Sequence, residues 1–142
     1  MRIKARSQLA AILALLGALA GTSPAFANDY SVDFGVETKA GKDAGSLTCQ
    51  LDQTCNGELE SLGLRVSVLL YRSPYDRGDR ASIHLNDRDF SCCYFEYAAD
   101  RIMIDPRQSL HRVPFFKGVR ARGGLYIENE RVGTLYLKFH SC

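Results

Sequence analysis

Apolar and polar residues alternate with a period of two along several short segments of this chain. The alternation is clearest at residues 30–36, where Tyr, Val, Phe and Val alternate with Ser, Asp and Gly. Such a pattern is typical of a β-strand with one buried face. The same alternation, or a short apolar run, predicts further strands at residues 64–71, 81–85, 90–97, 101–104, 111–116, 125–128 and 133–139.

Some of these segments carry more specific predictions. Residues 90–97 are the most aromatic and least charged, which predicts a central strand covered on both faces. Pro114 lacks a backbone N–H, so residues 111–116 are predicted to form an edge strand or a bulge. Residues 125–128 and 133–139 are predicted to pair as a closing hairpin. Residues 39–46 contain two glycines and are predicted to form a loop.

These segments together predict the fold class. Seven or eight short strands are separated by turns, and an apolar pattern of helical period is seen only before residue 28. The expected fold is therefore all-β: a single antiparallel β-sandwich, immunoglobulin-like in architecture, or a small barrel.

The first 27 residues have the layout of a secretory signal peptide. A cationic start with Arg2, Lys4 and Arg6 precedes a 12-residue apolar run, and a small-residue site ends at Ala27. We expect cleavage there, which leaves residues 28–142 as one exported domain, periplasmic or secreted. The apolar run is shorter than the roughly 20 residues of a membrane-spanning helix, so no membrane insertion is expected after cleavage.

All five cysteines follow the predicted cleavage site, and an oxidising compartment favours disulfides between them. We expect Cys49 to pair with Cys55 across a short polar loop. A second bond is expected between Cys142 and Cys92 or Cys93, with Cys93 preferred, because it would fasten the last strand to a central one. An odd number of cysteines leaves one unpaired, which would permit a dimer linked through that thiol.

Charge is uneven along the chain rather than large in total. Without its three basic leader residues, the chain has 15 basic and 16 acidic residues, which gives no argument for binding nucleic acid. Residues 29–60 contain seven acids and two bases, whereas residues 107–122 contain five bases and no acid. The two segments either face each other in the fold or present surfaces of opposite charge.

The cysteines and histidines suggest two kinds of chemistry besides a purely structural role. Cys92, Cys93, His140 and Cys142 could form a metal or thiol-redox site if the fold brought their two segments together. The spacing of these residues matches no common metal motif, and the hydrolase motifs Gly-x-Ser-x-Gly, Ser-x-x-Lys and His-Glu-x-x-His are absent. We therefore expect no cofactor, and a metal-binding or thiol-redox protein is kept as the alternative function.

Residues 107–124 are the strongest candidate for a functional surface. They combine five cations with two adjacent phenylalanines, and Arg beside aromatic residues is the composition of interface anchors. On a strand, one of the two adjacent phenylalanines faces the core and the other faces solvent. The expected function is a non-enzymatic binding module, inhibitor-like or immunity-like, for a protein partner with an acidic surface. Its predicted anchors are Arg112, Phe115, Phe116, Arg120 and Arg122.

Overall fold

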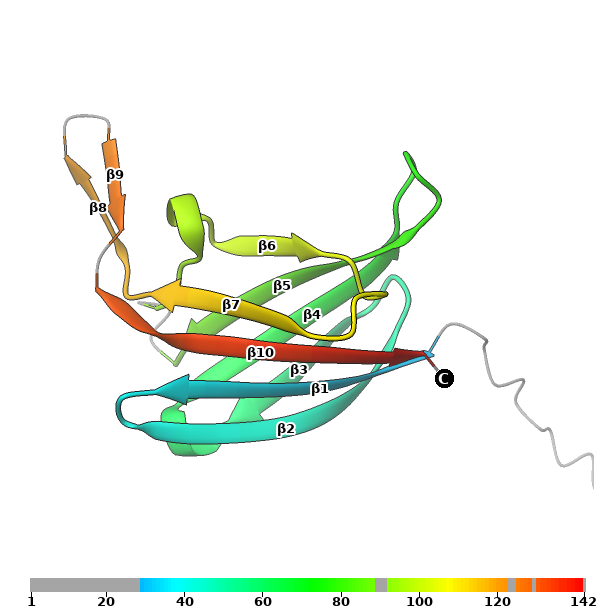
Figure 1. Cartoon of the computed structure of the whole chain (residues 1–142), viewed down its shortest axis with the longest axis horizontal. Helices are drawn as coiled ribbons and strands as arrows, with labels where there is room; N and C mark the ends of the chain where they lie inside the picture. Colours follow the sequence, from blue (N-terminus) through cyan, green and yellow to red (C-terminus); the bar gives the residue numbers. More distant parts are fainter. Residues whose placement is uncertain (1–28, 89–91, 123–124, 129, 142) are drawn as a thin grey trace, which may run out of the picture.

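The computed structural model describes residues 29–88, 92–122, 125–128 and 130–141. The signal peptide predicted for residues 1–27 lies outside this range. The described residues form ten strands and two short 3-10 helices (Figure 1). In chain order these are β1 (Asp29–Thr38), β2 (Gly41–Gln50), β3 (Thr54–Leu59), η1 (Glu60–Leu62), β4 (Leu64–Arg72), β5 (Asp79–Asp87), η2 (Glu96–Ala98), β6 (Arg101–Ile104), β7 (His111–Phe116), β8 (Val119–Arg122), β9 (Leu125–Glu128) and β10 (Arg131–Ser141).

Eight of the strands form two antiparallel sheets of four, which confirms the predicted all-β fold. Sheet A has the order β2-β1-β10-β7, and sheet B has the order β3-β4-β5-β6. The first and last strands pair along almost their whole length, so Tyr30 lies opposite Ser141. No helix in the described part of the chain has the length and hydropathy needed to cross a membrane.

The strand order is an up-and-down meander. Around the two sheets, β1 to β7 follow one another in sequence, and β10 then closes the circuit between β7 and β1. An immunoglobulin-like sandwich has Greek-key connections instead, so the likeness to that architecture is limited to its two packed sheets. At the corner between the sheets, Cys49 of β2 is bonded to Cys55 of β3, which confirms the first predicted disulfide.

The core lies between the sheets and follows the alternation seen in the sequence. Its fully buried side chains include Phe95 and Phe115, together with aliphatic residues of both sheets: Val32, Leu59, Val66, Val68, Leu70, Ile83, Leu85, Leu135 and Leu137. Within β10, Leu135, Leu137 and Phe139 point inward, whereas Tyr136 and Lys138 lie on the outer face. Burial of these apolar side chains is the main force that holds the sheets together.

The predicted loop at residues 39–46 was wrong, because most of it belongs to strand β2. The inward positions of β2 are held by small and polar residues up to Gly45, followed by Leu47 and Cys49, so the apolar half of the alternation is missing. Gly45 has to be small because a Cβ there would lie 2.7 Å from the ring of Phe34. The backbone is a strand although its sequence lacks the usual apolar signal.

The predicted central strand at residues 90–97 was also wrong. Residues 89–91 lie outside the described range, Tyr94 makes one isolated bridge to Phe116, and residues 96–98 form η2. The second predicted disulfide is corrected as well, since Cys93 is bonded to Cys92 rather than to Cys142. In a β-strand, adjacent side chains point to opposite faces and could not bond to each other. Cys92 and Cys93 do not lie in a strand, so the prediction, which assumed one, was wrong.

The hairpin predicted from residues 125–128 and 133–139 does not form. Strand β9 pairs with β8, and β10 pairs with β1 and β7. The reason is that β10 is a central strand of sheet A and buries its inward apolar residues in the core between the sheets. Strands β8 and β9 form a separate two-stranded sheet. This β8–β9 hairpin projects from one end of the molecule, and the C-terminal end of β10 lies at the opposite end (Figure 1).

Candidate functional site

Strand β7 places three of the five predicted anchors. It is an edge strand of sheet A, as Pro114 predicted. Phe115 points into the core with 0% of its surface exposed, so it is a structural residue rather than a contact residue. Phe116 is half-buried, and Arg112 is exposed. The strand therefore presents Arg112 and Phe116 to solvent on the face opposite Phe115.

The free edge of β7 offers few backbone groups to a partner. The N–H and C=O of Phe116 are bonded to the backbone of Tyr94 and thus point away from β10. Groups on alternate residues of a strand point the same way, so Pro114 also faces outward, where it has no N–H to donate. Proline on an edge strand blocks the addition of another strand. Since Pro114 interrupts the backbone donors of this edge, we expect recognition there to rely mainly on side chains.

Two cations at this edge have no internal counter-charge. Arg112 and Lys117 are exposed, and neither forms an ion pair with any residue that the structure describes. Many other charged side chains are paired, for example Arg65 with Glu58 and Lys42 with Glu37. The positive charge of Arg112 and Lys117 is thus available to a partner.

The remaining two predicted anchors are carried on the projecting hairpin. Arg120 and Arg122 belong to β8, opposite Ile127 and Leu125 of β9. The hairpin follows β7 after a short turn, so the basic segment of the sequence runs from the sandwich edge onto the hairpin (Figure 1). We call Arg112, Phe116, Lys117, Arg120 and Arg122 the basic edge.

The alternative metal site is not assembled among the described residues. Cys92 and Cys93 are bonded to each other near the end of β5, where the N–H of Cys93 donates to Leu85. His140 lies near the end of β10, with Nε2 3.0 Å from Asp33 Oδ2. Tyr94, next to the disulfide, pairs with Phe116, which is matched to Arg131 at the other end of β10. Cys142 lies outside the described range.

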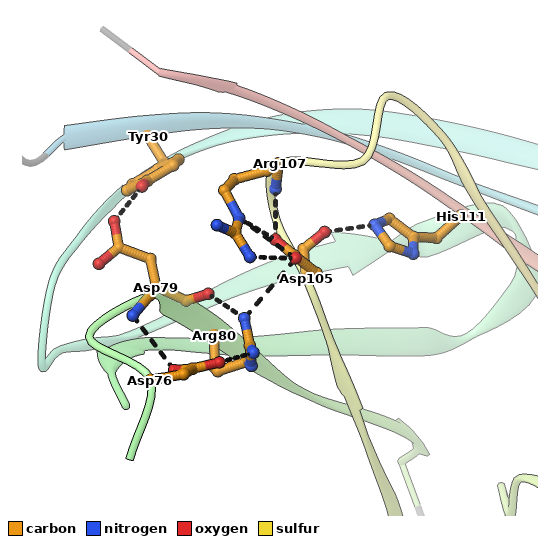
Figure 2. A network of polar contacts seen from close by, with 8 residues as sticks. Tyr30, Asp76, Asp79, Arg80, Asp105, Arg107 and His111 are labelled. Carbon is orange, nitrogen blue, oxygen red and sulfur yellow. Dashed lines mark hydrogen bonds and ion pairs between the residues drawn. The ribbon is translucent and has the colours of Figure 1, made fainter. Parts of the chain in front are cut away.

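A polar cluster joins the two sheets (Figure 2). It lies where β1 and β5 begin, at the end of the molecule opposite the hairpin (Figure 1). Arg107 donates to both carboxylate oxygens of Asp105, at 2.7 to 3.2 Å. Arg80 forms ion pairs with Asp76 and Asp105, and the Tyr30 hydroxyl donates to Asp79. His111 Nε2 lies 2.9 Å from the backbone oxygen of Asp105, which can only accept a hydrogen bond. Nε2 therefore carries the proton.

The cluster fastens strands together rather than presenting reactive groups. Burial and its hydrogen bond to Asp79 raise the pKa of Tyr30 to about 12, so the phenol stays neutral and acts as a donor. Hydrogen bonds from Arg107 hold the pKa of Asp105 well below its usual value. Asp79 also ends an Arg-Gly-Asp tripeptide, but its carboxylate is engaged by Tyr30 and Arg72. Such a carboxylate is not free to bind an integrin-type receptor.

We predict a loss of stability in acid that depends on this cluster. The pKa of Asp105 is lowered from 3.8, and Asp76 shifts in the same direction because of hydrogen bonds from Gly78 and Ser73. As the pH falls below about 5, the unfolded chain takes up protons before the folded chain does. The stabilisation is complete above that pH and disappears on acidification. Thermal melting at neutral pH and at about pH 3 measures the difference.

Asp105→Asn is the matching variant for this measurement. It removes the titrating carboxylate, so its melting temperature is expected to change less between the two pH values. Equal acid sensitivity of Asp105→Asn and the unaltered protein would contradict the assignment.

No protein-family model, curated protein sequence or solved structure matches this chain.

Proposed function

We propose that this chain is an exported, non-enzymatic binding module that recognises the acidic surface of a protein partner through its basic edge. The observation that supports this most directly is that Arg112 and Lys117, at the two ends of β7, are exposed and form no ion pair with a residue in the described part of the chain, while the half-buried ring of Phe116 precedes Lys117. An aromatic residue flanked by basic side chains is a common anchor in protein interfaces. Continuation onto the hairpin adds Arg120 and Arg122.

The scaffold supports this proposal in two ways. Strand β7 is paired with β10 in a four-stranded sheet, and binding residues are commonly presented by such a rigid scaffold. The two disulfides suit an oxidising compartment, so we place the protein in the periplasm or outside the cell. An inhibitor-like or immunity-like module would act by occluding the surface of its partner.

The proposal is tested by charge reversal at the basic edge. The partner is first isolated by crosslinking and affinity capture from an envelope or secreted fraction, and its binding is then measured with purified proteins. The double variant Arg112→Glu, Lys117→Glu is expected to slow association about tenfold or more at low salt, because complementary charge steers the encounter. Phe116→Ala with Arg120→Glu is expected to speed dissociation by removing an anchor.

The control is the double variant Arg65→Glu, Arg77→Glu, an equal change of charge on the outer face of sheet B and in the loop before β5. It is expected to leave binding unchanged. Raising the salt concentration is expected to weaken the unaltered complex and to affect the double variant less. If the double variant and the control bound equally well, the basic edge would not be the recognition surface.

A further inference from the structure

The outer face of sheet A carries a second feature, centred on β1, β2 and β10. One residue from each strand lies in a row across the sheet: Ala44, Gly35, Tyr136 and Arg112. Gly35 and Ala44 have almost no side chain, so the sheet surface next to Tyr136 consists largely of exposed backbone. The half-buried phenol ring therefore borders a low area of the sheet over β1 and β2.

This low area is hollowed along both sides of the row. One hollow of about 560 Å³ lies toward Asp33, Ser46 and Lys138. Another of about 520 Å³ lies toward Glu37 and Lys42. Gly35, Ala44 and Tyr136 line both hollows. We call the two together the Tyr136 hollow.

The rim of the Tyr136 hollow carries acidic and basic side chains that are paired with one another. Ser46 donates to Asp33 at 2.6 Å, and Asp33 also lies 3.0 Å from His140 Nε2. On the other side, Lys42 lies 3.3 Å from Glu37. The acids and bases of this rim largely neutralise each other. Such a rim suits a neutral ligand rich in hydroxyl groups better than it suits an acidic protein surface.

We propose that the Tyr136 hollow binds a neutral oligosaccharide with equatorial linkages. Pyranose rings joined in this way form a flat, extended ribbon, and their axial C–H groups make an apolar face that packs on an aromatic ring. The shallow floor at Gly35 and Ala44 has almost no side chains to obstruct such a ribbon beside the Tyr136 ring. Hydroxyl groups at the edges of the sugar both donate and accept, as the rim requires. This site does not depend on the proposed recognition of a protein partner.

The test is calorimetric titration of the purified protein with cellohexaose and with chitohexaose. Saturable binding of at least one of them is expected. Gly35→Val fills the hollow: a Cβ at position 35 would lie 3.6 Å from the nearest atoms, an ordinary contact distance, so the fold should accept it. This variant is expected to weaken binding about tenfold or more, as is Tyr136→Ala, whereas Tyr136→Phe keeps the ring and is expected to bind almost normally.

The results separate this site from the basic edge. The variant Phe116→Ala, Arg120→Glu lies outside the row of Tyr136, because Phe116 is opposite Arg131 and Arg120 belongs to β8. It is expected to bind the oligosaccharide normally, and Gly35→Val is expected to bind the protein partner normally. The proposal is overturned if neither oligosaccharide binds at millimolar concentration. It is equally overturned if Gly35→Val remains folded and binds as tightly as the unaltered protein.

Discussion

Replacing Phe115 by Ala is expected to lower the free energy of unfolding by about 3–5 kcal/mol. The ring is completely buried between the sheets. Its removal reduces the apolar surface that folding buries, and it leaves a cavity in the core. Urea denaturation followed by circular dichroism measures the change. The same substitution at Phe116, whose ring is only half-buried, is expected to cost clearly less.

This pair of variants also separates stability from recognition. Phe115 lies in the core and Phe116 belongs to the basic edge, although the two are adjacent in the sequence. A loss of partner binding in Phe115→Ala should therefore follow its loss of folded protein, whereas Phe116→Ala should lose binding while it stays folded. Equal destabilisation by the two substitutions would contradict the orientation of β7.

Gly57→Ala is expected to destabilise the fold by about 1–3 kcal/mol, although it adds only one methyl group. The new Cβ would overlap the end of the Phe34 ring, which is itself buried. Strand β3 would have to move away from sheet A, or the ring would have to leave its place. Thermal and urea denaturation should both show the effect. Gly45→Ala faces the same ring with a longer distance of 2.7 Å and is expected to cost less.

A double variant tests whether the Phe34 ring is the cause. Phe34→Leu shortens the side chain, so the added methyl group of Gly57→Ala gains room. Gly57→Ala is expected to lower the free energy of unfolding less in the Phe34→Leu background than in the unaltered protein. The effects of the two changes would then not be additive, as expected for residues in contact. Additive effects of the two changes would show that the methyl group clashes with something else.

The sequence predicted those strands whose apolar residues alternate. Strands β1, β4, β5 and β7, and the buried residues of β10, follow directly from that pattern, because each strand buries one face in the core. Strand β2 was missed for the same physical reason. Its inward face is shaped to accept Phe34 and is therefore made of Gly45 and small or polar neighbours. A strand whose inward side chains are small, to leave room for a large neighbour, does not show the alternation of apolar and polar residues by which strands are predicted.

The candidate sites differ in how far the sequence predicted them. The basic segment and the opposite orientations of Phe115 and Phe116 could be predicted, because they depend on neighbouring residues of one strand. The cluster of Asp105, Arg80 and Tyr30 was missed, since its members come from distant segments that only the fold brings together. The turns that contain Asp76 and Asp105 gave a local signal for polar side chains, but no information about their partners.

The pairing of β1 with β10 has a practical consequence for attaching this protein to a surface. Residues 30 and 141 lie opposite each other, at the end away from the β8–β9 hairpin (Figure 1). A linker fused beyond either residue would leave from the same pole of the molecule. Immobilised through such a linker, on a sensor chip or a bead, the protein would hold its hairpin toward the solution, whichever terminus carried the attachment.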